Sequence, residues 1–194
     1  MAHFEDRELV RIVDAAVAEA ARKAGHWVRC RSGCTQCCVG VFPISGFDAL
    51  RLKNGLRDLA AADPPAAGRV RARALNWLVR NEAEFPGDSA TGILRPDGDA
   101  LFEFYANDEP CPALDPETGL CDLYESRPAT CRLFGVPLRM DPGAVGVCEL
   151  CFDGALEAEI EACAVDLDIA ALETELAGDA APRGDTIVAF CLAR

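Results

Sequence analysis

Eleven cysteines dominate the chemistry that this chain of 194 residues can offer. Four of them fall together in the segment Cys30-x3-Cys34-x2-Cys37-Cys38, with Gly33 inside it. Thiolates at this spacing can converge from one tight loop on a soft metal, as they do in zinc sites and iron–sulfur clusters. Neighbouring side chains diverge, so Cys37 and Cys38 suit a polynuclear centre, two adjacent centres, or one ligand beside one packed thiol. The dense clustering disfavours the alternative that all four pack as small buried hydrophobic side chains.

A second group of cysteines lies at even intervals in a segment that is rich in proline and glycine. These flanking residues predict loops or short helix starts, and Pro128 fits the first turn of a helix that presents the last thiol of the group. The group consists of Cys111, Cys121 and Cys131.

Together these segments resemble the YkgJ-type cysteine-cluster family, which is described as a zinc- or iron-chelating domain. The family pattern is C-x3-C-x2-C-C, then Cys-Pro, then G-x-C-x-x-Y-x-x-R-P-x-x-C-R. Its counterparts here are Cys30 to Cys38, Cys111-Pro112, and Gly119 to Arg132. A related cysteine motif occurs in flagellin lysine N-methylase, which implies that some relatives are enzymes. The resemblance implies that the metal ligands or their neighbours are Cys30, Cys34, Cys37, Cys38, Cys111, Cys121 and Cys131.

The four remaining cysteines divide into two kinds. Cys148 and Cys151 have the two-residue gap of a metal knuckle, and we count them as further candidate ligands. Cys163 shares a helical face with Leu156 and Ile160, which predicts a buried core thiol. Cys191 lies in the C-terminal apolar run and is predicted to be a core thiol as well.

The number of candidate thiolates exceeds the four that one zinc ion takes, so we expect two sites or one polynuclear site. An all-thiolate donor set favours an iron–sulfur cluster over zinc, although multinuclear zinc would use the same ligands. The chain has two histidines, and we expect His26 to be a packed or exposed imidazole rather than a ligand. Four arginines flank ligand positions and can offset the thiolate charge or bond to loop carbonyls. They are Arg29, Arg31, Arg127 and Arg132.

The overall charge limits the classes of partner. Lys and Arg total 19 against 32 Asp and Glu, for a formal charge of −13, which disfavours nucleic acids and anionic membranes. The basic stretch of Arg69, Arg71, Arg73 and Arg80 is predicted to be a solvated helix face. The longest apolar run, 187–193, is too short for a membrane span. The N-terminal residues lack the pattern of a signal peptide, so we expect a cytoplasmic protein.

The apolar periodicity predicts a mainly α fold with irregular, cysteine-rich, metal-stabilised loops, in one domain over residues 1–194. Its core motif covers about 27–152 and has helical flanks. Leu101 to Tyr105 is the one candidate for a short β element. Helices are expected over residues 5–25, 46–62, 66–85, 154–163 and 166–177, and the capping-box pattern at Ser45 marks the start of the second.

No phosphate-binding or dinucleotide-binding glycine motif is present in the sequence. The carboxylate pairs Asp97/Asp99 and Asp166/Asp168 are predicted to be turn and helix-cap residues. We therefore expect a cytosolic metal-binding protein that acts in redox chemistry, in metal handling or as a module for an unidentified protein partner. The alternatives are a metal-dependent enzyme, such as a methyltransferase-like relative of the flagellin methylase, and an interaction domain with structural zinc.

Overall fold

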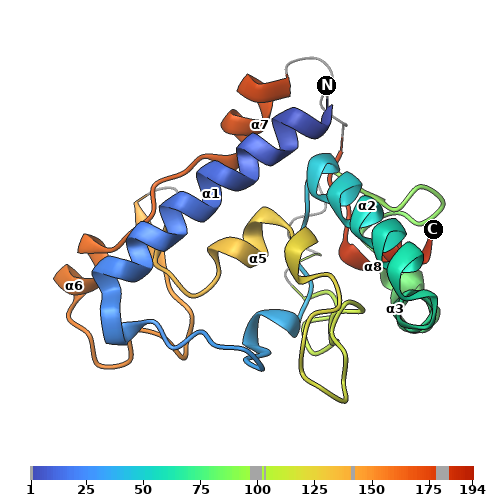
Figure 1. Cartoon of the computed structure of the whole chain (residues 1–194), viewed down its shortest axis with the longest axis horizontal. Coiled ribbons are helices and arrows are strands. Elements are labelled where there is room, and N and C mark those ends of the chain that lie inside the picture. Colours follow the sequence, from blue (N-terminus) through green and yellow to red (C-terminus); the bar gives the residue numbers. More distant parts are fainter. Residues whose placement is uncertain (1, 97–101, 103, 141–142, 178–183) are drawn as a thin grey trace. The chain divides into compact units, whose positions relative to one another are not determined.

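The computed structural model describes residues 2–96, 102, 104–140, 143–177 and 184–194 (Figure 1). The chain divides into two compact units, each built from distant parts of the sequence. Unit 1 comprises Met1–Ser32 and Ala129–Ala181, and unit 2 comprises Gly33–Pro128 and Pro182–Arg194. That these units form one domain, as the sequence predicts, stays a prediction.

The predicted mainly α fold is confirmed, because the described residues form seven α-helices and two small two-stranded sheets. The α-helices are α1 (Ala2–Ala24), α2 (Gly46–Ala62), α3 (Pro64–Asn81), α5 (Ala129–Leu133), α6 (Glu157–Ala162), α7 (Ile169–Ala177) and α8 (Val188–Ala193). The short 3-10 helices are η1 (Gly25–Trp27), η2 (Gln36–Cys38), η3 (Glu82–Glu84) and η4 (Tyr124–Ser126). The strands are β1 (Gly87–Asp88), β2 (Ile93–Leu94), β3 (Leu138–Met140) and β4 (Ala144–Gly146).

Unit 1 is organised on the long helix α1, against which α5, α6 and α7 pack (Figure 1). The apolar stripe predicted for this helix is confirmed, since Leu9, Val13 and Ala20 are buried. The buried guanidinium of Arg132 on α5 also donates to both carboxylate oxygens of Asp14, each at 2.9 Å. Hydrophobic burial and this ion pair together fix α5 on α1.

A small β element completes unit 1, at a place other than the Leu101–Tyr105 segment for which the sequence predicts one. Strand β3 pairs antiparallel with β4, and Leu138 also forms a parallel bridge with Val165. The N–H of Arg139 donates to the Val165 carbonyl at 2.9 Å, and the N–H of Val165 donates to the Pro137 carbonyl at 2.8 Å. These long-range bonds tie the chain between α6 and α7 to the hairpin.

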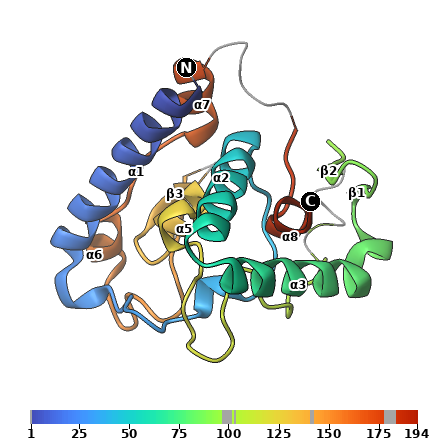
Figure 2. The ribbon, with the colours of Figure 1, turned by 45° about the vertical axis from the view of Figure 1, so that its right-hand side comes forward.

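Three helices, α2, α3 and α8, form the main body of unit 2 and pack on one another (Figure 2). The predicted cap of α2 is confirmed, because the Ser45 hydroxyl accepts from the N–H of Asp48 at 3.2 Å. Asp63 caps α3 in the same way by accepting from the N–H of Ala66 at 3.0 Å, and Pro64–Pro65 occupy the first turn. Prolines are tolerated there because these N–H groups have no partner within the helix.

The core of unit 2 takes residues from all three helices. Leu52, Val70 and Leu192 are almost completely buried. Cys191 lies in the same cluster, so the prediction that it is a core thiol is confirmed.

Two predicted elements differ from the structure. The helix predicted over 66–85 is α3 followed by η3, and the hairpin β1–β2 comes after it. The predicted strand over Leu101–Tyr105 is wrong where it can be checked, since Phe102 is helical and Phe104 lies in a turn, while Leu101 and Glu103 are outside the described residues. The Tyr105 hydroxyl instead donates to the Asn81 carbonyl at 3.0 Å, and its ring meets Trp77 edge-on.

The C-terminal helices α6 and α7 are confirmed but shorter than predicted. Asp168 caps α7, since its carboxylate accepts from the N–H of Ala171 at 2.9 Å. Asp97 and Asp99 lie outside the described residues. Cys163 is buried as predicted, but Leu156 on the predicted shared face is 70% exposed. Among the described residues, no helix combines the length and apolar character needed to cross a bilayer.

We predict that Leu52→Ala lowers the free energy of unfolding by about 2–5 kcal/mol, because it leaves a cavity in the core of unit 2. Leu75→Ala on α3 is the matched control: its side chain is 52% exposed, whereas Leu52 is 1% exposed. The control is expected to change the stability by less than about 0.5 kcal/mol. Urea unfolding followed by circular dichroism measures both, and equal losses would contradict the packing described here.

Candidate metal centre

The backbone of unit 2 places the first cysteine segment beside the Cys-Pro segment. The N–H of Cys111 donates to the Cys38 carbonyl at 2.8 Å, and Val39 forms an antiparallel bridge with Pro110. Gly40 follows with a φ of +88°, and a Cβ at this position would lie 3.1 Å from the Asn107 carbonyl oxygen. Glycine therefore permits the close approach of two segments that are distant in the sequence.

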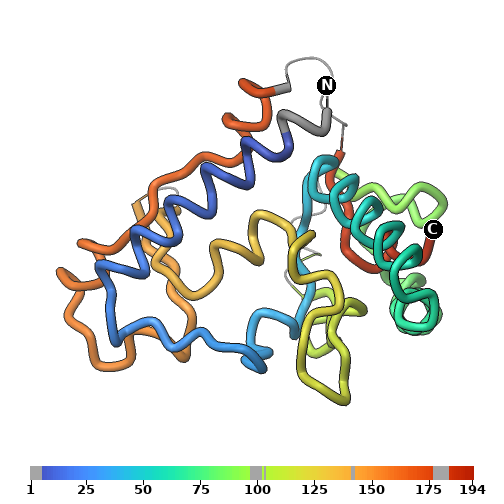
Figure 3. Tube along the Cα trace, in the orientation of Figure 1, coloured from blue at the N-terminus to red at the C-terminus, as the bar shows by residue number. Residues whose placement is uncertain are grey.

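The segment over residues 111–123 turns back on itself in a tight loop (Figure 3), and the pairing across this loop brings Cys121 back toward Cys111. Leu114 and Cys121 form an antiparallel bridge, and the N–H of Asp122 donates to the Ala113 carbonyl at 2.9 Å. Cys111 and Cys121 also pack against the core cluster that contains Leu52. We call Cys37, Cys38, Cys111 and Cys121 the unit 2 thiol cluster.

The sulfurs of this cluster act on one another electrostatically. The Cys38 thiol donates a hydrogen bond that lowers the pKa of Cys37 to about 6, and the charge of Arg127 acts in the same direction. The pKa of Cys38 is raised, first by that hydrogen bond and then by burial and by the charges of Cys37, Cys111 and Cys121. Several thiolates in one place repel each other, so a bound cation would stabilise them jointly.

Backbone N–H groups point at two of the sulfurs. Burial raises the pKa of Cys111 to about 12, against hydrogen bonds from the N–H groups of Ala113 and Leu114 that favour the thiolate. Burial likewise raises the pKa of Cys121, against a hydrogen bond from the N–H of Leu123. Hydrogen bonds to sulfur are one of the means by which proteins tune thiolate-bound metal centres.

Arg73 on α3 holds the loop that carries Cys111 and Cys121. Its guanidinium donates to the Pro112 carbonyl at 2.8 Å and to the Asp122 carboxylate at 2.5 Å. The prediction that Arg73 belongs to a solvated face is therefore wrong, while Arg69 and Arg71 are exposed as predicted. Sequence reasoning missed this role, although Arg73 directly precedes Ala74 on the apolar stripe of the helix.

A buried ion pair supports the neighbouring segment. Arg51 donates to the Asp48 carboxylate at 2.6 Å, with both side chains buried, and to the Arg127 carbonyl at 3.1 Å. Arg127 itself donates to the Tyr124 carbonyl at 2.9 Å and lies over the Tyr124 ring. Arg127 thus bonds to a loop carbonyl and also places its charge near the thiols, so both roles considered from the sequence apply.

Four predicted ligands lie in unit 1. The sulfur of Cys30, an exposed residue, lies so close to Gly135 that a Cβ there would be 2.2 Å from it, and Gly135 has a φ of +100°. Cys131 is half-buried on α5, and Cys148 and Cys151 are buried. His26 is exposed and its ring lies against Trp27, so the prediction of a packed or exposed imidazole is confirmed.

The fifth predicted ligand in unit 2 is Cys34, which is half-buried shortly before η2. Within the described ranges, no three or more His, Cys, Asp or Glu side chains already stand in an arrangement that would hold a metal ion. Binding would therefore have to draw the thiols of the unit 2 thiol cluster closer together. That all nine predicted cysteines are ligands stays a prediction.

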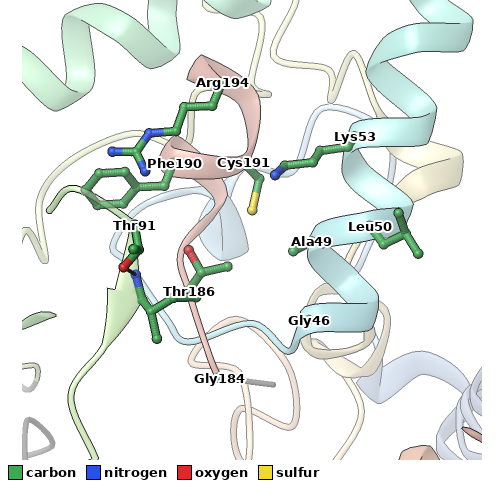
Figure 4. Close-up of a pocket in the computed structure, with 11 residues that line it drawn as sticks. Gly46, Ala49, Leu50, Lys53, Thr91, Gly184, Thr186, Phe190, Cys191 and Arg194 are labelled. Atoms are coloured by element: carbon green, nitrogen blue, oxygen red, sulfur yellow. Dashed lines mark hydrogen bonds between the residues drawn. The ribbon is translucent and has the colours of Figure 1, made fainter. Parts of the chain in front are cut away.

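A separate cavity of about 280 Å³ in unit 2 is lined by α2, α8 and the residues near β2 (Figure 4). Lys53 extends from α2 toward Cys191, and Thr186 and Phe190 contribute to the wall. Burial raises the pKa of Cys191 to about 11, against the charge of Lys53 and a hydrogen bond with Thr186. Cys191 is thus kept as a neutral thiol, as expected for a core position.

Comparison with protein families identifies the cysteine pattern. A family model named CxxCxxCC, with the description "Putative zinc- or iron-chelating domain", matches residues 29–141. The chain belongs to this family. The resemblance predicted from Cys30–Cys38, Cys111-Pro112 and Gly119–Arg132 is thereby confirmed. The family name has two residues between its first two cysteines, whereas this chain has three between Cys30 and Cys34. No curated protein and no solved structure matches the chain significantly.

We predict that Arg73→Ala weakens metal binding about 10–100-fold, because the loop of Cys111 and Cys121 loses its anchors on α3. Arg71→Ala is the matched control on the same helix, since Arg71 is exposed. A chelator competition titration of the metal-loaded chain measures both affinities. Equal affinities for the two variants would show that Arg73 does not position the ligands.

Proposed function

We propose that this protein binds iron or zinc through the unit 2 thiol cluster. The observation that carries the proposal is the backbone pairing that brings Cys37 and Cys38 beside Cys111 and Cys121 from distant parts of the chain. All four residues lie inside the segment that matches a zinc- or iron-chelating family. Thiolate sulfur is the donor that both zinc and iron–sulfur clusters use.

Within this proposal an iron–sulfur cluster is favoured and zinc is the alternative. The donor set consists of sulfur alone, and four thiolates match the ligand count of a cluster. The same four thiolates around one zinc ion would leave a net charge of about −2. Arg127 acts electrostatically on Cys37 and Cys121 and would offset part of that charge permanently, because a guanidinium does not lose its proton.

The bound centre would act first as a cross-link. The segments that carry the four thiols have little regular structure, so metal binding would supply part of their folding free energy. A cluster would add electron transfer, whereas zinc would leave a redox-inert module for a protein partner. For Cys30, Cys34 and Cys131 as further ligands, the support is the family resemblance.

The number of cysteines and their clustering in the sequence support a reducing compartment. Disulfides persist mainly outside the cytosol, and a cysteine-rich cytosolic chain more often uses its thiols for metals or catalysis. We therefore propose a cytoplasmic location.

The proposal is tested by purifying the full chain without oxygen and measuring iron, zinc, acid-labile sulfide and the visible spectrum. We expect brown protein with iron and sulfide in similar amounts, and colourless protein with zinc would select the alternative. Cys37→Ser and Cys111→Ser should each lose this centre. Cys191→Ser, which changes a core thiol of the same unit, should keep it. Protein without metal, even after reconstitution, would contradict the proposal.

A further inference from the structure

Unit 1 contains a second group of thiols, beyond the segment that matches the family. Cys148, Cys151 and Cys163 are 8%, 4% and 6% exposed and belong to one buried cluster with Ala24 and Phe152. The family match ends at residue 141, so it assigns no role to any of them.

A tight turn pairs the first two sulfurs. The N–H of Cys151 donates to the Cys148 carbonyl at 2.9 Å, which closes the two-residue gap into one turn. The two thiols are hydrogen-bonded to each other. Both sulfurs therefore lie on the same side of the turn, as two ligands of one ion must.

Backbone N–H groups converge on these sulfurs. The N–H of Arg29 donates to the Cys151 sulfur at 3.4 Å. The N–H groups of Leu150 and Cys151 are directed at the sulfur of Cys148. Backbone N–H groups directed at sulfur are a feature of thiolate-bound metal centres.

Contacts from η1 and the following residues hold this arrangement. The N–H of Phe152 donates to the Trp27 carbonyl at 3.0 Å, and the two rings stack 6.5 Å apart. Phe152 has a φ of 59°, a backbone conformation that costs free energy for a residue with a side chain. Cys163, at the C-terminal end of α6, joins the same cluster.

Cys191 shows what a plain core thiol looks like in this chain. It is as deeply buried as Cys151, but its sulfur is hydrogen-bonded to the Thr186 side chain. Packing as a small hydrophobic side chain explains the burial of both residues. It does not explain the knuckle turn or the backbone donors at Cys148 and Cys151.

We propose that Cys148, Cys151 and Cys163 form a second metal site, in unit 1, which binds one zinc ion through three thiolates. The fourth position of the tetrahedron would go to a water molecule, as in zinc sites with three protein ligands. Binding replaces three thiol protons by one Zn²⁺ and involves no oxidant or reductant. Because no three donors in the described part of the chain yet stand in ligand geometry, the end of α6 must close on the turn.

Zinc stoichiometry of the full chain tests the site. After chelator treatment, reloading with Zn²⁺ and desalting, Cys148→Ser and Cys163→Ser should each hold one zinc ion fewer per chain than the unsubstituted protein. Cys191→Ser is the matched control, a buried thiol that should lose none. Cys37→Ser should remove metal from unit 2 and leave the zinc of unit 1, so the two proposals fail separately. Unchanged zinc in Cys163→Ser would overturn the site.

Alkylation of the unsubstituted chain gives a second readout, which does not depend on how the variants fold. In the zinc-loaded protein, Cys148, Cys151 and Cys163 should resist iodoacetamide, and mass spectrometry should find them labelled together once a chelator is added. Cys191 should be labelled only after unfolding. If Cys163 is labelled only after unfolding, like Cys191, and not together with Cys148 and Cys151 when the chelator is added, the site is overturned. A Cys148–Cys151 disulfide in protein prepared without oxygen would also overturn it.

Discussion

Thiols that are packed together and partly buried cannot all ionise unless a cation joins them, and much of unit 2 is arranged around this constraint. The pKa of Cys38 is raised by its hydrogen bond to Cys37 and then by burial, and the charges of Cys37, Cys111 and Cys121 act in the same direction. Arg127 favours ionisation of Cys37. One guanidinium cannot neutralise four thiolates, so a divalent or polynuclear centre is the simplest physical solution.

The helices and the loops of unit 2 contribute differently to keeping the thiols together. Helices α2, α3 and α8 bury the aliphatic side chains that stabilise unit 2, while the thiols lie on segments with little regular structure. Side chains from the helices then fix those segments. Arg73 reaches from α3 to the loop of Cys111, and Arg51 reaches from α2 to the carbonyl of Arg127. Sulfur positions therefore depend on helix packing, and changes far from any thiol can weaken metal binding.

Sequence reasoning was most successful where the signal is local. Helix caps such as Ser45 and the buried stripe of α1 follow from the spacing of a few neighbouring residues, and the cysteine spacing sufficed to predict the family. Pairing between distant segments was not predictable, because nothing near Cys38 encodes its bond to Cys111. For the same reason the sequence predicts Arg73 to be a surface residue. Tyr105 does not lie in the strand that the sequence predicts, because its ring packs edge-on against Trp77.

The central claim is that sulfur atoms of this chain hold the metal, and X-ray absorption at the metal edge of the protein, purified without oxygen, tests it most directly. We predict a first shell dominated by sulfur, at about 2.3 Å for zinc or at a similar distance for an iron–sulfur cluster. A shell of nitrogen and oxygen at about 2.0–2.2 Å with no sulfur would contradict the claim.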